Sequence, residues 1–153
     1  MKQIEVREAG IQDIPACAQI ISTEDAWRVY GLDYLKSYDV LSTMDDVIYV
    51  ALKNEKVIGF ITIKINGVGN VGAYVRMIAV NREYRGTGVG TVLVEYIQNL
   101  AKQNGKNNIF LICSVENSNA KRFYERVGFK QVGILESLVI DNHDEILFRR
   151  IAE

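Results

Sequence analysis

The chain has 153 residues, the size of one ordinary domain, with 48% hydrophobic and 24% charged residues, as is typical of globular proteins. These proportions exclude a disordered or fibrous chain, and a formal net charge of -1 excludes the basic surface of a general nucleic-acid binder. The N-terminus has no apolar core of signal-peptide length, and the longest apolar run, VIGFITI, is too short to span a bilayer. We therefore expect a cytoplasmic protein with no membrane partner.

The first forty residues predict one strand and two helices. Apolar residues alternate over residues 2–7, as in a half-buried strand. They then recur at helical spacing after Asp13, a predicted N-cap, with Pro15 in the first turn and an end near Ser22. Aromatic residues three or four positions apart in residues 22–40 indicate a second helix, which a glycine interrupts.

The rest of the chain mixes hairpins with strands that are joined through helices. Residues 47–53 and 56–65 are separated by a short polar turn, which predicts an antiparallel hairpin. A strand at 71–80 leads into a helix that begins at Thr87 or Gly88. The later elements are predicted as a strand, a short helix and a final strand pair, at 109–115, 118–127, 129–140 and 145–151. Together they predict an α/β fold with a mixed, mostly antiparallel sheet of six to seven strands flanked by about four helices.

Residues 85–90, RGTGVG, form what we call the glycine-rich loop, between a predicted strand and a predicted helix. The first turn of a helix has backbone N–H groups without internal partners, glycines let an anion approach them, and Arg85 adds positive charge. The loop therefore predicts a pyrophosphate site. A Walker A loop would need Gly-Lys-Ser/Thr, and a dinucleotide fingerprint would need glycine where Thr91 stands and an acidic residue about 20 positions later. Both are missing.

Two motifs together resemble a known family. The glycine-rich loop fits R-x-x-G-x-G, and NSNAKRFYERVGF, residues 117–129, fits N-x-x-A-x-x-x-Y-x-x-x-G-F. Both follow a strand and open a helix, and the order of elements over nearly the whole chain is similar too. The chain thus resembles the GNAT acetyltransferase superfamily. The resemblance implies a single GNAT-like N-acetyltransferase domain over residues 1–153, acetyl-coenzyme A as co-substrate, and no metal.

The resemblance also implies a coenzyme site. In this family two parallel neighbouring strands splay apart, the pantetheine arm lies between them, and a backbone N–H stabilises the oxyanion. Here those strands are residues 74–80 and 109–115. Asn117 also suits the N-cap of the next helix, and both roles are compatible. The implied cofactor-binding residues are Ile78, Ala79, Val80, Arg85, Gly86, Thr87, Gly88, Val89, Gly90, Thr91, Asn117, Asn119 and Tyr124.

Catalysis needs a proton donor for the leaving thiolate and a base for the amine. Tyr124 matches the family's general acid by its place in the motif, and a phenol keeps its proton at pH 7. Residue type alone favours a core tyrosine instead. The strands AYVRMIAV and NIFLICSV lack the glutamate that the family often uses as base. Glu116 and Glu24 are the candidates that remain, and each is alternatively a plain surface carboxylate.

Three further residues are expected to stay out of the chemistry. Cys17 and Cys113 are far apart in sequence and predict buried, reduced thiols, without a disulfide or zinc site. Cys113 has no histidine nearby in sequence, so direct transfer is preferred to an acyl-cysteine intermediate. His143 falls in a predicted turn and is expected to face solvent.

Residues 22–40 form one wall of the acceptor site in similar proteins, and we call them the acceptor segment. Their acidic and aromatic side chains suit a cationic amine, whereas an amphipathic helix packed on the sheet explains them equally. The candidate substrate-binding residues are Glu24, Asp25, Trp27 and Tyr30.

The predicted function is direct acetyl transfer from acetyl-coenzyme A to a primary amine: a polyamine, a small amine, a lysine or a protein N-terminus. A homodimer is compatible with this function, and nucleic acid is not an expected partner. The alternative is a non-catalytic acyl-coenzyme A sensor or interaction module on the same fold. Tyr124 favours catalysis, because a pure binder needs no proton donor.

Overall fold

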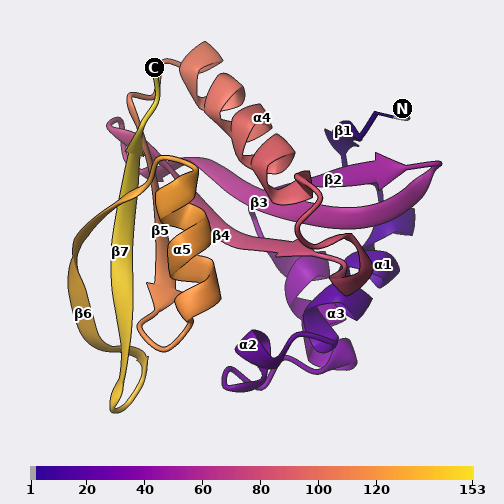
Figure 1. Ribbon diagram of the computed structural model, residues 1–153, viewed down its shortest axis with the longest axis horizontal. Coiled ribbons are helices and arrows are strands. Elements are labelled where there is room, and N and C mark those ends of the chain that lie inside the picture. The colour runs from indigo at the N-terminus through magenta and orange to yellow at the C-terminus, as the bar shows by residue number, and fades with distance from the viewer. Residues whose placement is uncertain (1–2) are drawn as a thin grey trace. The chain divides into compact units, whose positions relative to one another are not determined.

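Seven strands pair in the order β1-β2-β3-β4-β5-β7-β6 in a computed structural model that describes residues 3–153 (Figure 1). The β4–β5 pair is parallel, whereas the pairs β1–β2, β2–β3, β5–β7 and β6–β7 are antiparallel. This confirms the predicted mixed α/β fold. The strands are β1 (Glu5–Glu8), β2 (Val47–Lys53), β3 (Lys56–Val68), β4 (Gly72–Val80), β5 (Asn108–Ser114), β6 (Lys130–Ile140) and β7 (His143–Ile151). The helices are α1 (Ile14–Ser22), α2 (Asp25–Arg28), α3 (Tyr34–Thr43), α4 (Val89–Gln103) and α5 (Ser118–Arg126), with 3-10 turns η1 (Ile11–Asp13) and η2 (Arg82–Tyr84).

The chain divides into two compact units. The first unit consists of Met1–Ile63 and Met77–Tyr96, and the second of Lys64–Arg76 and Ile97–Glu153. Strands β3 and β4 and helix α4 each contribute to both units. Each unit is described by itself below.

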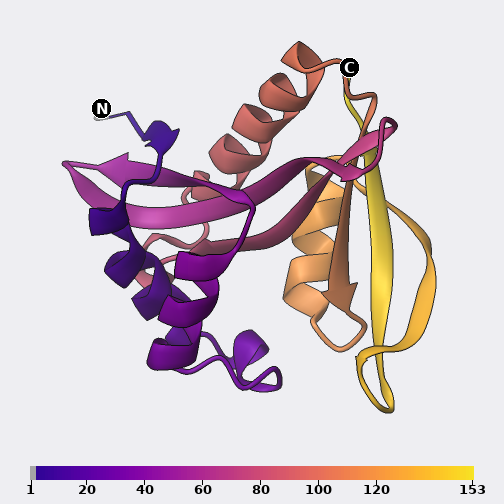
Figure 2. The ribbon, with the colours of Figure 1, turned by 180° about the vertical axis from the view of Figure 1, so that it is seen from behind.

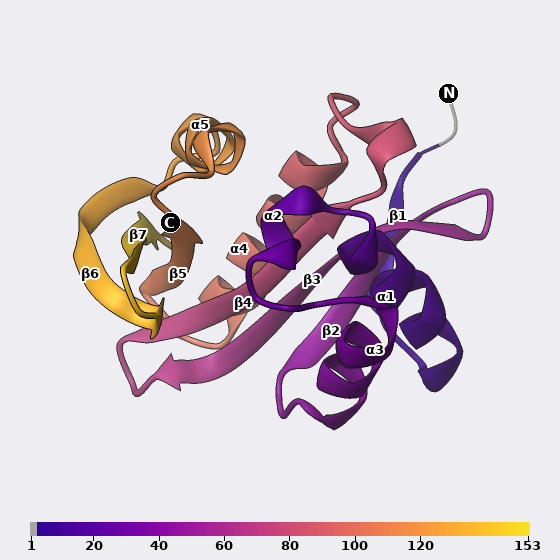
Figure 3. The same cartoon turned by 90° about the horizontal axis from the view of Figure 1, so that it is seen from below.

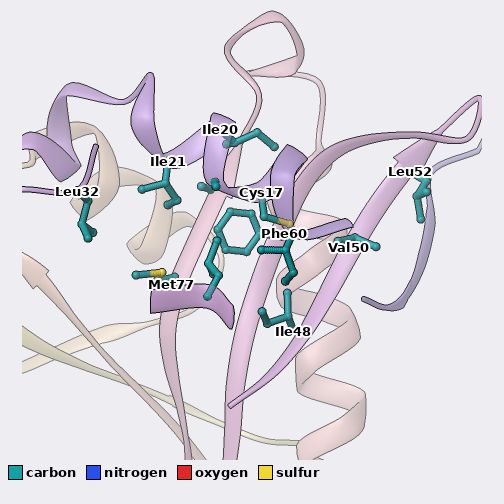
Figure 4. Close-up of a cluster of buried hydrophobic side chains, with 13 residues drawn as sticks. Cys17, Ile20, Ile21, Leu32, Ile48, Val50, Leu52, Phe60 and Met77 are labelled. Atoms are coloured by element: carbon teal, nitrogen blue, oxygen red, sulfur yellow. The ribbon is translucent and has the colours of Figure 1, made fainter. Parts of the chain in front are cut away.

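The first unit packs helices against the β1–β2–β3 strands. Figures 2 and 3 show α1 and α3 lying together beside these strands. Apolar side chains of α1 meet Phe60 of β3 and Met77 of β4 in one cluster (Figure 4). Phe60 and Cys17 are fully buried, and burying a side chain of phenylalanine size contributes about 1.5–3 kcal/mol. This core fixes the strand from which the glycine-rich loop departs.

The second unit packs α5 on the β5–β7–β6 strands (Figure 1). Leu111 of β5 lies opposite Phe148 of β7, both are buried, and the ring of Phe148 contacts Tyr124 of α5. Strand β6 ends the strand order, and most of its residues are exposed. Tyr124 thus packs against buried side chains of the β5–β7 strands.

The acceptor segment differs from the prediction of one interrupted helix. The chain forms a short α2 and a separate α3, because Gly31 adopts a positive φ of 72° and ends the first turn. Asp33 then caps α3 by accepting a hydrogen bond from the N–H of Lys36 at 2.8 Å. The aromatic residues are therefore divided between two helices.

Asp13 occupies the N-cap position of α1 but does not cap it, so the predicted role is wrong. Its carboxylate accepts hydrogen bonds from Arg7 Nη1 at 2.6 Å and from the N–H of Gly10 at 2.8 Å. Asp13 is also the last residue of η1, and its φ of -88° and ψ of -18° are helical, whereas an N-cap residue is typically extended. Asp13 instead ties α1 to β1.

Within the described residues, the remaining boundaries agree with the predictions to within about three residues, and the predicted start of the first strand at residue 2 lies outside them. Asn54 and Glu55 form the β2–β3 turn with positive φ, and Asn142 does so between β6 and β7. No helix within residues 3–153 combines the length and apolarity needed to cross a membrane.

Candidate active site

The glycine-rich loop has a backbone that only glycine adopts easily. Gly86 and Gly88 have φ of 73° and 93°, and a Cβ built at either position would meet no atom within 4 Å. These two glycines are therefore required by the backbone conformation and not by tight packing, and the space beside them is open. Gly90 lies inside α4.

The start of α4 is pressed closely against the sheet of the first unit. A Cβ on Gly59 of β3 would lie 3.1 Å from both the carbonyl oxygen of Ala79 and Val89 Cγ1. Val89 is buried, and Val92 donates its N–H to the carbonyl of Gly88 at 3.0 Å. The first-turn N–H groups, which have no intrahelical acceptor, are thus held in place beside the loop. Such a turn is suited to an anion.

Two arginines connect the loop region to the start of the acceptor segment. Arg85 forms an ion pair with Glu24, and Arg82 Nη2 donates to the carbonyl of Thr23 at 2.7 Å. The side chain of Glu24 is 15% exposed, so it is not a plain surface carboxylate. The negative charge of Glu24 is already paired with Arg85, and this pairing argues against Glu24 as the general base for the amine.

The parallel ladder between β4 and β5 is short. It runs from Gly72 opposite Asn108 to Val75 opposite Leu111, whereas β4 continues to Val80 and β5 to Ser114. The parallel pairing of these strands is as predicted. Ile78, Ala79 and Val80 all come after Val75, the last residue of β4 that pairs with β5.

Tyr124 is both a core residue and a candidate acid. Its ring lies 5.9 Å from that of Phe129 and 5.7 Å from that of Phe148, and it is 9% exposed. Burial raises the pKa of its hydroxyl well above the usual value of 10.0, and the neighbouring Cys113 and Tyr74 raise it further. The phenol therefore keeps its proton at neutral pH, as a donor must.

Asn117 caps α5 as predicted. Its side-chain oxygen accepts the N–H of Ala120 at 3.1 Å, while Asn119 accepts a hydrogen bond from Arg122. Glu116, the other candidate base, is exposed. The motif thus begins with a residue that orients the helix carrying Tyr124.

The candidate acceptor residues do not form one stripe. Trp27 and Tyr30 pack against the buried cluster of the first unit, whereas Tyr34 and Tyr38 are 37% and 38% exposed. Asp25 forms an exposed ion pair with Arg28 at 3.3 Å. The packing interpretation therefore holds for Trp27 and Tyr30.

Sequence reasoning missed a buried pair on β7. His143 was expected to face solvent, but its side chain is only 11% exposed and its Nε2 lies 3.4 Å from Oε2 of Glu145. Glu145 is 2% exposed. The available signal was the alternation along β7, which places both residues on one face.

The cysteines are free and buried, as predicted. Burial raises the pKa of Cys113 to about 11, with a further contribution from the charge of Glu145. Cys113 is therefore a protonated thiol at neutral pH. Within residues 3–153 no three His, Cys, Asp or Glu side chains are grouped to hold a metal ion.

Comparison with known proteins decides the family. Residues 12–129 match the model of the acetyltransferase (GNAT) family. The chain belongs to this family. The match covers both motifs.

Individual relatives of this GNAT chain differ in how much they share with it. N-alpha-acetyltransferase 30 of Schizosaccharomyces pombe is 36% identical over 83 residues, which are 53% of this chain and 55% of that protein. The chain thus spans about half the length of such relatives. The N-alpha-acetyltransferase of Saccharolobus solfataricus is 29% identical over 97% of this chain and 93% of its own length.

A solved structure extends the likeness to the fold. An aminoglycoside 6'-N-acetyltransferase complexed with coenzyme A has a TM-score of 0.72 and 18% identity, covering 97% of both chains. At this identity the likeness concerns the fold alone.

Proposed function

We propose that the chain is an acetyl-coenzyme A-dependent N-acetyltransferase, formed as one domain, that transfers the acetyl group directly to a primary amine. The glycine-rich loop and the first turn of α4 bind the diphosphate, and the strand residues Ile78, Ala79 and Val80 pair with the pantetheine arm. Tyr124 donates a proton to the departing thiolate. The acetyl thioester supplies an activated acyl group, and the protein supplies binding, orientation and proton transfer.

The observation that carries this proposal is the open space at Gly86 and Gly88. Both glycines hold a left-handed backbone, no atom would meet a Cβ there, and the loop opens a helix of fifteen residues. A diphosphate fits this arrangement, because first-turn N–H groups and an arginine both favour negative charge.

A peptide or protein α-amine is the acceptor class that we favour. The relative from Saccharolobus solfataricus, aligned over nearly the whole chain, is named an N-alpha-acetyltransferase. Glu24, at the start of the acceptor segment, carries a negative charge that a cationic amine would share with Arg85. Polyamines, small amines and lysine side chains are the other acceptors to be tested.

The test is release of free thiol from acetyl-coenzyme A over a panel of peptides and amines. The parent protein is expected to turn over at least one acceptor, and Tyr124→Phe is expected to lower kcat by about 100-fold at saturating acetyl-coenzyme A. Equal turnover by parent and Tyr124→Phe would remove the assigned acid.

The alternative of a non-catalytic acyl-coenzyme A sensor gives a different result in the same experiment. A sensor would bind acetyl-coenzyme A in calorimetry but release no thiol with any acceptor. No binding heat at millimolar coenzyme would contradict both proposals.

A further inference from the structure

Two lysines close the β2–β3 hairpin directly opposite each other, and we call them the lysine pair. Lys53 and Lys56 are partners in the antiparallel register, and the turn between them consists of Asn54 and Glu55, both with positive φ. Like charges in directly opposite positions of two strands destabilise the pairing. An anion bound between the two ammonium groups would relieve this repulsion.

The ring of one tyrosine holds both ammonium groups close together. Nζ of Lys53 lies 5.9 Å and Nζ of Lys56 lies 5.7 Å from the centre of the Tyr84 ring. An aromatic face attracts an ammonium group, so the ring opposes the separation that repulsion alone would cause. Within residues 3–153, neither lysine forms an ion pair with a carboxylate. The positive charge of the lysine pair is therefore available to a ligand.

The backbone connects Tyr84 to the glycine-rich loop on one side and to the hairpin on the other. Tyr84 directly precedes Arg85, and its carbonyl oxygen accepts a hydrogen bond from the hydroxyl of Thr87. Its N–H donates to the carbonyl of Asn81 at 2.9 Å, and the N–H of Asn81 donates to the carbonyl of Ile58 in β3 at 2.8 Å. All these residues belong to the first unit. The lysine pair is thus fixed beside the loop by contacts within one unit.

A phosphate monoester is the anion that suits two lysines. Such a group carries a charge of about -1.5 to -2 at pH 7 and three acceptor oxygens, and lysine binds phosphate as a compact positive charge. Coenzyme A has one monoester, the 3′-phosphate, on the ribose that also carries the diphosphate. Because only this ribose separates the two groups, a site for the 3′-phosphate must lie next to the diphosphate site. The lysine pair meets this condition if the glycine-rich loop binds the diphosphate.

We propose that Lys53 and Lys56 bind the 3′-phosphate of coenzyme A and that Tyr84 is their positioning residue. This inference rests on the proposed N-acetyltransferase function, because it takes the glycine-rich loop as the diphosphate site. Backbone N–H groups bind the diphosphate, and lysine side chains bind the monoester. The β2–β3 hairpin thereby distinguishes coenzyme A from dephospho-coenzyme A, which lacks the 3′-phosphate.

The two arginines of the same region are engaged elsewhere. Arg82 donates to a backbone carbonyl of the acceptor segment, and Arg85 is paired with Glu24. A monoester would have to displace these contacts to use the arginines, whereas it can approach the lysine pair without breaking an ion pair. The nearby carboxylates in the sequence, Glu55 and Glu83, are exposed, so solvent screens their repulsion of the ligand.

The experiment compares acetyl-coenzyme A with acetyl-dephospho-coenzyme A, two ligands that differ only in the 3′-phosphate. Calorimetry measures the Kd of each ligand for the parent, Lys53→Gln, Lys56→Gln and the double variant. Lys36→Gln, the same change at an exposed lysine of α3, is the matched control. Circular dichroism reports on folding.

The parent is expected to bind acetyl-coenzyme A about tenfold more tightly than the dephospho ligand, each single glutamine variant to reduce this ratio about threefold, and the double variant to abolish it. The Kd of the dephospho ligand is expected to change by less than about twofold in every variant, since the removed charges lie outside its contacts. A general loss of structure would weaken both ligands. Lys36→Gln is expected to match the parent.

Tyr84 is tested by two changes of the same ring. Tyr84→Leu removes the aromatic face and is expected to reduce the ratio about threefold, while Tyr84→Phe keeps the face and the ratio. Equal ratios in Tyr84→Leu and Tyr84→Phe would remove Tyr84 from the positioning role.

Two results would overturn the lysine site and leave the proposed function intact. One is a parent protein that binds the two ligands equally, and the other is a double glutamine variant that keeps the ratio of the parent. A parent protein that binds neither ligand would remove the proposed function, and this inference with it.

Discussion

Arg85 of the glycine-rich loop forms an ion pair with Glu24 at the start of the acceptor segment. The side chain of Arg85 is 48% exposed, whereas that of Glu24 is only 15% exposed. The arginine proposed to attract a diphosphate is therefore already shared with the segment proposed to attract an amine. Under the proposed function, the diphosphate would compete with Glu24 for Arg85, and a cationic amine would compete with Arg85 for Glu24.

Glu24→Gln is expected to strengthen coenzyme binding and weaken amine binding. Removing the carboxylate frees Arg85 for the diphosphate. Because Arg85 is half exposed, we take the about 0.2–1 kcal/mol of solvent-screened ion pairs, so the Kd for acetyl-coenzyme A should fall by up to about fivefold. The KM for a cationic acceptor should rise, because negative charge is lost. Calorimetry and steady-state kinetics measure the two effects.

Asp25→Asn is the matched control, because Asp25 is the adjacent carboxylate and pairs with Arg28 on the surface. It should leave coenzyme affinity unchanged. Weaker coenzyme binding in Glu24→Gln would show that Glu24 orients Arg85 instead of competing for it.

Gly88→Ala is expected to weaken coenzyme binding by about tenfold or more. An added Cβ meets no atom within 4 Å, so the effect comes from the positive φ of 93°, which alanine adopts at a cost of about 1–2 kcal/mol, and from a methyl group in the anion space. Gly105→Ala imposes a similar backbone cost, with φ of 71° and an equally open Cβ position, just after α4 ends. Both variants should lose similar stability in urea unfolding. Equal coenzyme affinity in the two would contradict a diphosphate site at Gly88.

The sequence predicted the strands and the long helix because their signals are local. Two strand-like runs separated by a short polar turn located the β2–β3 hairpin, and apolar residues at helical spacing after the glycine-rich loop located α4. The interruption at a glycine was predicted too, but not that Gly31 separates two helices. The ion pair of Asp13 with Arg7 depended on tertiary geometry. A cap and a buried ion pair use the same residue type, so sequence alone does not separate them.

The residues of the candidate site that belong to a sequence motif were predictable, and the others were not. The glycine-rich loop, Asn117 and Tyr124 came from two motifs. Glu145 escaped because a carboxylate beside a turn normally faces water, and only the pairing of β5, β7 and β6 places it 2% exposed. Glu24 was named as a candidate base, but its ion pair with Arg85 joins residues 61 positions apart in the chain.

Asp13→Ala is expected to lower the free energy of unfolding by about 1–3 kcal/mol at pH 7. The change removes the hydrogen bonds that Arg7 and the N–H of Gly10 donate to a nearly buried carboxylate. The hydrogen bond from Arg7, above all, lowers the pKa of Asp13 below 3.8, so this stabilisation is present above pH 3.8 and is lost as pH falls through the folded-state value. Urea unfolding at pH 7, 4 and 3 should show parent and variant converging in acid. A constant difference over that range would mean that the charge of Asp13 is irrelevant to stability.

Cys17→Ala is expected to make stability less sensitive to alkaline pH. Burial raises the pKa of Cys17 from 9.0 to about 12, with a smaller effect of the charge of Asp13, so the folded protein keeps a proton that the unfolded chain loses. A raised folded-state pKa gives stability that is complete below pH 9 and declines between pH 9 and 12, by about 1.4 kcal/mol for each pH unit and each such group. Cys113 and Tyr124 add to this slope in parent and variant alike. Urea unfolding between pH 8 and 10 measures the slopes, and identical slopes would show that Cys17 ionises in the folded protein as easily as in the unfolded chain.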